Sequence, residues 1–227
     1  MLVQTQCIAR DAIREVLKNT LILVAVDLIV CVATEMEGAL LRPHLPVVAT
    51  GVGAVNAACA LTRFLEREGA RRVIVCGIGG AYPKSDLRIG EAVWASSECY
   101  GDLGALSPGG FLDMRAMGFP LIAGAENVYN SLPLDIVPSP HAVPFATVNT
   151  CTGEDSAAAA MAQRTGAAVE NMEGAAIAHI ARLYGIPCGE VRGISNLTGN
   201  RDRAAWKVKE ASAAAQEALL SFITARP

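Results

Sequence analysis

Short apolar runs recur along the chain, and each is bounded by glycine, proline or polar residues. Runs of this length and character predict buried strands. Their lack of apolar–polar alternation favours a sheet that is largely parallel and covered on both faces. The predicted strands lie at residues 27–33, 47–50, 72–76, 91–100, 144–150 and 188–194.

Segments with apolar residues at helical spacing separate most of these runs. They predict a short amphipathic helix within residues 8–24, a helix that ends near Glu68, and helices at about 155–164, 171–184 and 203–224. Gly185 and Pro187 supply a stop signal for the helix at 171–184. The alternation of strand and helix predicts a single α/β domain with a central mixed, twisted sheet flanked by helices.

Two predicted strands run into glycine-rich segments, at residues 51–53 and 77–80. Both are predicted to be tight turns, or places where the backbone closely approaches a small ligand. Neither completes the glycine fingerprint of dinucleotide-binding proteins, which disfavours a dinucleotide-dependent oxidoreductase. Residues 101–140 lack sustained periodicity and predict a long irregular segment, a feature that is often functional.

Composition narrows the class of protein. The 227 residues suit one domain with a large core, because 52% are hydrophobic and 18% are charged. A net charge of −3 argues against a nucleic-acid partner. Seven cysteines without a CxxC pair favour reduced thiols in a cytoplasmic protein over a zinc ribbon or disulfide framework. The longest apolar run, residues 21–33, is too short to span a membrane, which takes ~20 residues.

Acidic residues stand at two places that are candidates for chemistry. Glu35 and Glu37 directly follow the first predicted strand, and Glu170 and Glu173 precede an apolar helical stretch. Acids suit a helix N-terminus, but α/β proteins also place their sites at the carboxyl ends of strands. The pattern leaves open which acid of the first pair serves. A carboxylate such as Glu173 at the start of so apolar a helix is costly unless it binds a ligand.

Ser195 and Asn196 end the last predicted strand. They are common turn formers, and they can equally present a hydroxyl and an amide to a ligand. The three histidines stand far apart without metal-ligand spacing, and no GxSxG motif is present. The sequence therefore indicates neither a metal site nor a serine-hydrolase elbow.

Six segments together resemble the nucleoside phosphorylase and nucleosidase superfamily. They are ATEMEGALL (33–41), TGVGAVNAA (50–58), CGIGGAYP (76–83), TGED (152–155), VENMEGAAIAH (169–179) and RGISN (192–196). The resemblance implies a nucleoside phosphorylase-like α/β domain over residues 26–227. Residues 1–25 have no counterpart in it, and we interpret them as an N-terminal extension, either helical or produced by a mis-assigned start.

Within the superfamily, TEMEGALL (34–41) and SNLTGNRDRAAWKVKEA (195–211) resemble the futalosine hydrolases of menaquinone biosynthesis. Cleavage of an N-glycosidic bond passes through an oxocarbenium-like transition state, which needs carboxylates near the ribose and donors near the purine. The resemblance implies that Glu173 and the Met172 backbone hold the ribose hydroxyls and that Glu37 deprotonates the attacking water. Other substrate-binding residues are expected at Gly79, Gly153, Ser195 and Arg201.

Asn196 departs from the adenine-releasing nucleosidases, which carry an aspartic acid at this position. An amide donates to one atom and accepts from another, which suits a 6-oxopurine such as hypoxanthine. The resemblance therefore favours futalosine as the substrate. Two alternatives stay open, namely a methylthioadenosine or adenosylhomocysteine nucleosidase and a non-catalytic nucleoside-binding protein on the same scaffold.

The loop after the first predicted strand carries Glu37 and no arginine, whereas phosphorylases place a phosphate-binding arginine there. This difference favours hydrolysis over phosphorolysis. The resemblance implies no metal or organic cofactor, and a homodimer or larger homo-oligomer. The anionic carboxyphenyl end of futalosine calls for a cation or backbone donors, and the candidates are Arg201 and the 101–140 segment with Phe111, Arg115 and Phe119.

Overall fold

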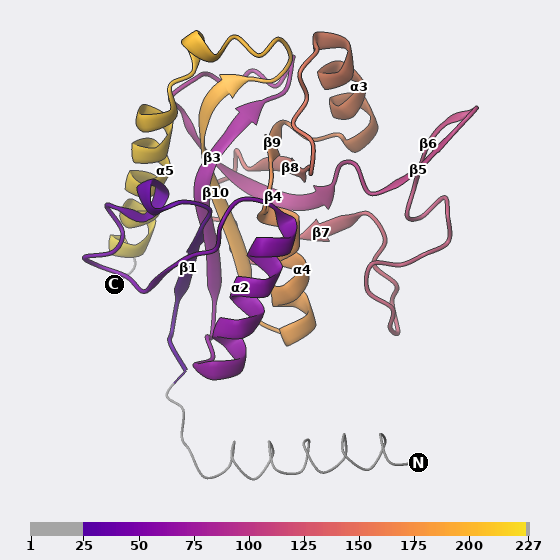
Figure 1. Cartoon of the computed structure of the whole chain (residues 1–227). Coiled ribbons are helices and arrows are strands. Elements are labelled where there is room, and N and C mark those ends of the chain that lie inside the picture. The colour runs from indigo at the N-terminus through magenta and orange to yellow at the C-terminus, as the bar shows by residue number, and fades with distance from the viewer. Residues whose placement is uncertain (1–24, 226–227) are drawn as a thin grey trace, which may run out of the picture.

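The computed structural model describes residues 25–225, so the helix predicted within residues 8–24 lies outside the described residues. One sheet runs in the order β10-β4-β8-β9-β3-β1-β2, and β7 pairs with β4 (Figure 1). Parallel and antiparallel pairs occur together, which confirms the predicted mixed sheet. The strands are β1 (Ile29–Val32), β2 (Val47–Ala49), β3 (Val73–Ala81), β4 (Ala92–Tyr100), β7 (Ser131–Pro133), β8 (Val143–Thr147), β9 (Val169–Asn171) and β10 (Cys188–Leu197).

Five of these strands close into a ring. β3 pairs with β10, β10 with β4, β4 with β8, β8 with β9, and β9 returns to β3. β1 and β2 extend the sheet beyond β3 as parallel neighbours. The ring brings together polar side chains that lie far apart in the sequence, such as Glu98 on β4 and Asn171 on β9.

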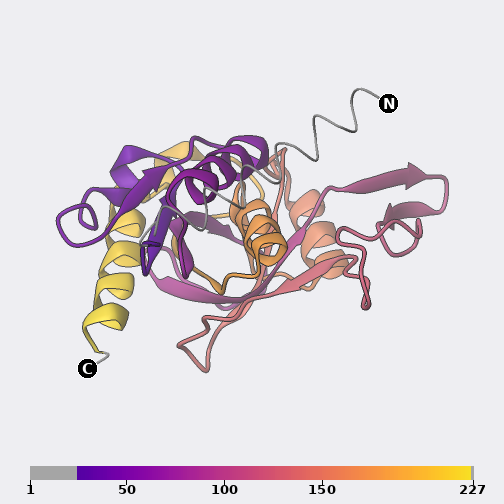
Figure 2. The same cartoon turned by 90° about the horizontal axis from the view of Figure 1, so that it is seen from below.

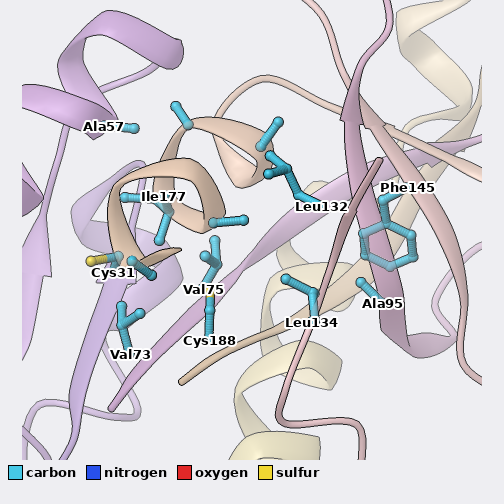
Figure 3. Packing of buried hydrophobic residues seen from close by; sticks show 14 of the residues in the cluster. Cys31, Ala57, Val73, Val75, Ala95, Leu132, Leu134, Phe145, Ile177 and Cys188 are labelled. Atoms are coloured by element: carbon cyan, nitrogen blue, oxygen red, sulfur yellow. The ribbon is translucent and has the colours of Figure 1, made fainter. Parts of the chain in front are cut away.

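Helices cover both faces of the sheet, as predicted. α2 (Ala54–Arg67) and α4 (Gly174–Tyr184) pack together on one face, and α5 (Val208–Thr224) lies on the other (Figure 1). Successive residues of β1 serve the two faces in turn, because side chains alternate along a strand. Ile29 and Cys31 join the core beneath α2 and α4, part of which Figure 3 shows, whereas Val30 and Val32 join the core beneath α5.

The prediction that the third strand ends near residue 76 in a glycine turn is wrong, because β3 continues through residues 77–81. Glycine is needed here for close packing. A Cβ on Gly77 would lie 2.7 Å from both Oε1 of Glu37 and Nη1 of Arg192. A Cβ on Gly79 would lie 2.6 Å from Cγ1 of Val169. These glycines therefore mark a crowded strand rather than a change of direction.

Three other predicted boundaries also differ from the structure. Residues 169–171 form β9, so α4 begins later than expected, because a three-residue strand is too short to show its own period. The last predicted helix divides into a 3-10 turn, η2 (Arg203–Ala205), and α5. Residues 101–140 include β7 and a hairpin of β5 (Gly104–Ser107) and β6 (Gly110–Asp113), which projects on the side away from α5 (Figure 2).

Across residues 25–225, none of the helices has the length and apolar character needed to cross a membrane. The cysteines in this part of the chain are free thiols, and Cys31, Cys76 and Cys188 are buried. Burial raises the pKa of the Cys31 thiol to about 12, which keeps it protonated. These cysteines behave as small apolar core residues.

Candidate active site

A cavity of about 340 Å³ opens where the carboxyl ends of β1, β3 and β10 meet the start of α4. This is the edge at which open α/β sheets bind their ligands. Short loops after β1, β2, β8 and β10 complete the walls. The cavity is lined by Ala33, Thr34, Met36, Glu37, Val52, Ile78, Gly79, Gly80, Cys151, Thr152, Glu170, Asn171, Met172, Glu173, Arg192, Ser195, Asn196, Leu197, Gly199, Asn200, Arg201, Trp206 and Val208.

Glu37 reaches this cavity from η1 (Glu35–Gly38), a 3-10 turn that directly follows β1. Its Oε2 accepts hydrogen bonds from the amide and the hydroxyl of Thr34, each at 2.8 Å. Its Oε1 accepts the amide of Ile78 on β3 at 2.9 Å. The residue is only 3% exposed, whereas Glu35 is exposed and forms an ion pair with Arg42. The structure therefore places Glu37, and not Glu35, at the site.

Glu173 is the residue that caps the start of α4, and it too is buried. Its Oε1 accepts the amide of Gly53 at 3.0 Å, and its Oε2 accepts from Nη1 of Arg192 at 3.2 Å. Gly53 has a φ of +96°, so a residue with a side chain would be strained there. Oδ1 of Asn171 accepts the amides of Glu173 and Gly174, which fixes this end of the helix. Glu173 is thus held from three sides.

Arg192 lines the cavity, and the sequence reasoning did not single it out. Its side chain is buried on β10, where Nε donates to Glu190 at 2.7 Å and Nη2 donates to Asn171 at 3.3 Å. Burial alone would lower the pKa of this guanidinium, but the carboxylates of Glu190, Glu173 and Glu37 raise it overall. The available signal was a pair of opposite charges, Glu190 and Arg192, two residues apart in a strand predicted to be buried, because buried charges need partners.

Glu170 lines the same cavity, but its carboxylate is already occupied. Oε2 accepts the hydroxyls of Tyr82 at 2.9 Å and of Thr152 at 2.7 Å, and Oε1 accepts the amide of Thr152 at 3.0 Å. Burial and the adjacent Glu170 carboxylate raise the pKa of Tyr82, which therefore remains a donor. Glu170 holds the β8–α3 loop against the cavity, where α3 spans Asp155–Thr165.

Ser195 and Asn196 lie where the pairing of β10 with β3 shifts register. The hydroxyl of Ser195 lies 2.8 Å from Oδ1 of Asn196 and 3.1 Å from the carbonyl of Gly79. Nδ2 of Asn196 donates to the carbonyl of Leu197 at 3.0 Å. The amide retains a second N–H and a second oxygen lone pair, so it can both donate to a ligand and accept from it.

Met172, Gly79 and Arg201 also line the cavity. Gly153 is not in its wall but lies against Arg201, where a Cβ would contact the side chain at 3.4 Å. The exposed guanidinium of Arg201 lies 5.2 Å from the ring centroid of Trp206, a cation–π distance. Its charge acts to lower the pKa of the Cys151 thiol, although burial raises that pKa overall. Arg201 is therefore a cation at the cavity edge.

Phe111, Arg115 and Phe119 do not reach this cavity within the chain. Phe111 lines a separate cavity of about 180 Å³, where the guanidinium of Arg164 lies over its ring at 4.0 Å. Arg115 stacks over Tyr129 at 4.6 Å, and Phe119 is 60% exposed. Of the residues named for the carboxyphenyl group, the structure brings only Arg201 to the cavity.

Two buried carboxylates that face one enclosed space can polarise water and stabilise positive charge that develops on a bound molecule. Asn196, in the wall of the same cavity, offers a free N–H donor and an acceptor. The site therefore combines the two requirements of glycosidic-bond cleavage, which are anions beside the sugar and hydrogen-bonding groups beside the leaving base.

The sequence profile of the phosphorylase superfamily matches residues 30–225. A futalosine hydrolase of Thermus thermophilus is 36% identical over 179 residues, which cover 75% of this chain and 77% of that protein. A futalosine hydrolase of Streptomyces coelicolor is 34% identical over 75% of both chains. The matched length reaches across the β strands and helices that build the cavity.

Solved structures share the fold at lower identity. The S-adenosylhomocysteine nucleosidase of Streptococcus pyogenes, in complex with 5-methylthiotubericidin, superposes with a TM-score of 0.74 at 21% identity, covering 89% of this chain and 98% of that one. The futalosine hydrolase of Helicobacter pylori superposes with a TM-score of 0.72 at 15% identity, covering 88% and 98%.

Proposed function

We propose that this chain, which belongs to the phosphorylase superfamily, hydrolyses the N-glycosidic bond of futalosine and releases hypoxanthine. The observation that carries the proposal is the pairing of two buried carboxylates, Glu37 and Glu173, across one cavity. Identity above 30% to two futalosine hydrolases over three quarters of the chain supports the substrate.

The reaction follows from the positions of these groups. Glu173 and the Met172 backbone bind the ribose hydroxyls, and Glu37 accepts a proton from the attacking water. As the bond between C1′ and the purine nitrogen breaks, its electron pair moves to the base and the sugar becomes oxocarbenium-like. The water oxygen bonds to C1′ as Glu37 takes its proton. The purine anion takes up a proton from solvent, and Glu37 returns its proton to solvent, so one water is consumed in each turnover. The buried carboxylates stabilise the positive sugar without having to reorganise.

Water rather than phosphate is the nucleophile in this proposal. The turn after β1 presents the carboxylate of Glu37, which repels a phosphate dianion. Arg192 lies beside it, but its Nε, Nη1 and Nη2 groups all donate to protein acceptors. Its guanidinium is therefore committed to holding carboxylates rather than a substrate phosphate.

The test is to incubate the purified full chain with futalosine, aminodeoxyfutalosine and methylthioadenosine, each with and without phosphate, and to identify the products. Release of hypoxanthine from futalosine at a rate independent of phosphate is the expected result. Glu37→Gln should lower kcat by about 10²–10⁴-fold while substrate still binds. A sugar 1-phosphate product, or preferential turnover of methylthioadenosine, would overturn the proposal.

Asn196 gives a second test, which concerns the base. We expect Asn196→Asp to shift the kcat/KM preference towards aminodeoxyfutalosine by about tenfold or more, because the acid can protonate the leaving base where an amide cannot. Asn127→Asp serves as the matched control, since it makes the same amide-to-acid change at an exposed position outside the cavity wall. An unchanged ratio for the two substrates would show that Asn196 does not select the base.

The proposal extends to the setting of the enzyme. We place the reaction in menaquinone biosynthesis and in the cytoplasm, where free thiols such as those of this chain persist. We also expect a homodimer or larger homo-oligomer. Support comes from exposed apolar side chains beside the cavity, where Val52 and Leu197 are 50% and 56% exposed.

A further inference from the structure

Two acids that the reaction does not use lie side by side inside the closed ring of strands. Glu98 projects from β4 and Glu190 from β10, and both are 0% exposed. Their carboxyl groups lie close together, because oxygens of both fall within 2.5 Å of the position that a single Cβ atom on Gly174 would take. Gly174, the first residue of α4, faces both, and a Cβ there would overlap both carboxyl groups. The packing leaves no room for an ion or any further group between them.

The contacts of this pair account for every carboxyl oxygen except one. Oε1 of Glu98 accepts Nδ2 of Asn171, and Oε2 lies 3.1 Å from the Thr147 hydroxyl and from its neighbouring amide at Cys99. Oε1 of Glu190 accepts Nε of Arg192. Among the described residues, Oε2 of Glu190 is the buried side-chain oxygen that has no N–H or hydroxyl donor. Two ionised carboxylates this close repel each other, and a proton on one of them supplies the donor that Oε2 of Glu190 otherwise lacks.

We propose that Glu98 and Glu190 share one proton, and that this pair positions Arg192 and, through it, Glu173. The proton resides on Glu98, because Glu190 is the acid that contacts the guanidinium and is stabilised as an anion. The chain of contacts then runs from the Glu98 hydroxyl to Glu190, from Glu190 to Nε of Arg192, and from Nη1 of Arg192 to Glu173. Glu98 and Glu190 are positioning residues that do not line the cavity.

The surroundings favour one proton on the pair. Burial and the charge of Glu190 raise the pKa of Glu98 well above its usual range, although Asn171 and Arg192 oppose this. Burial also raises the pKa of Glu190, and Arg192 acts against that rise. The charge of the pair raises the pKa of the neighbouring thiols and phenols, which are Cys76 on β3, Tyr82 just after β3, Cys99 and Tyr100 on β4, and Cys188 on β10. Glu173 at the start of α4 adds to the rise in the pKa of Glu190. Those thiols and phenols stay neutral, so none competes for the proton.

This inference rests on the proposed function only in its last step, where Glu173 binds the sugar. The pairing of the acids is a property of the folded protein, and it has a readout without any substrate. In the unfolded chain, Glu98 has the ordinary pKa of a glutamate, about 4, and loses its proton above that pH. The folded protein retains the proton at higher pH. The free energy of unfolding should therefore fall as pH rises from that range to the raised pKa of native Glu98.

Glu98→Gln is the first variant, because a glutamine amide replaces the acid's donor and keeps the hydrogen bond to Glu190. We would measure the free energy of unfolding of the full-length variant by denaturant titration at several pH values. It should decrease less with rising pH than that of the wild type. Glu126→Gln, an exposed site, should retain the wild-type slope. An infrared band of a protonated carboxyl group at neutral pH should be present in wild type and absent from Glu98→Gln. The proposal of a shared proton would be overturned if wild type and Glu98→Gln showed the same dependence of stability on pH and the same infrared band.

Kinetics test the positioning role separately. Glu98→Gln is expected to keep kcat for futalosine within about twofold, since it preserves the neutral donor, and to retain activity to higher pH than the wild type. Glu190→Gln removes the anion beside Arg192 and should lower kcat by about 10- to 100-fold, with a smaller change in KM. Glu98→Leu should lower kcat in the same way, because it leaves Glu190 without its donor.

Comparable losses of kcat in Glu98→Gln and Glu98→Leu would overturn the positioning role, because the conservative change would then have failed to rescue. Failure of the proposed function looks different. In that case no variant turns over futalosine, while the pH dependence of unfolding and the infrared band still distinguish wild type from Glu98→Gln.

Discussion

Gly77 shows how a single residue without a side chain permits the site to form. Oε1 of Glu37, from η1, and Nη1 of Arg192, from β10, both lie where a Cβ of this residue would be. Any Cβ there would displace one of these two groups. The guanidinium is buried in a close-packed interior, so it cannot move aside. Glycine at this position is therefore a condition for placing a carboxylate and a buried arginine on the same stretch of β3.

We expect Gly77→Ala to lower kcat/KM strongly and to destabilise the protein by about 1–3 kcal/mol, because overpacking forces buried groups apart. Gly124→Ala is the matched control, since a Cβ there makes only an ordinary contact with the backbone carbonyl of Glu126 at 3.8 Å. Enzyme assays and denaturant unfolding would measure both effects. An alanine variant with wild-type activity would show that Glu37 does not need this approach to β3.

At the scale of elements, α5 supports the turn that carries Glu37. The buried side chain of Gln216 accepts the amide of Leu40 at 2.8 Å and donates to the carbonyl of Met36 at 3.3 Å. The hydroxyl of Ser212, one turn earlier, lies 3.3 Å from the same carbonyl. A helix on the far face of the sheet thereby fixes the backbone on both sides of the proposed catalytic carboxylate.

Gln216→Leu should therefore reduce kcat as well as stability, the latter by about 1–3 kcal/mol, because it leaves the Leu40 amide without its acceptor and removes one donor from the Met36 carbonyl. Glu217→Ala, on the exposed side of the same helix, should change neither. Circular dichroism melts together with steady-state kinetics would separate the two effects. A loss of stability with unchanged kcat would mean that η1 keeps its position without α5.

The same elements show what the sequence could predict. Long apolar runs and helical spacing were enough for the alternation of strands and helices, because burial on two faces dominates their composition. The end of β3 and the three-residue β9 were missed, because these two segments lie far apart in the sequence and depend on pairing with each other. Val169 and Glu170 of β9 make that pairing. Acids at strand ends were visible as candidates, but Arg192 was not, because its role appears only when three carboxylates converge on it.

At the scale of the whole molecule, exposed apolar side chains stand beside the cavity. Val52 and Leu197 line it, and Val55 on the first turn of α2 is 81% exposed. Apolar side chains gathered beside a binding site favour burial against another protein surface. A second copy of this chain is the partner that we expect.

Val55→Glu should convert the oligomer to monomers, as measured by size-exclusion chromatography with light scattering, because a charge would be buried at the contact. Leu106→Glu is the control: this residue is 89% exposed on the β5–β6 hairpin, away from the cavity. A wild-type protein that is already monomeric, or a Val55→Glu variant with unchanged mass, would contradict this assignment of the contact surface.

Because Gly174 has no side chain, the residues allowed at positions 98, 174 and 190 depend on one another during evolution. Any larger residue there would occupy the space of the Glu98 and Glu190 carboxyl groups. A relative that gained a methyl group at this helix start would first have to lose or shorten one of the two acids, so the three positions should change in concert. The glycine thus sets the order in which mutations can be accepted along this lineage.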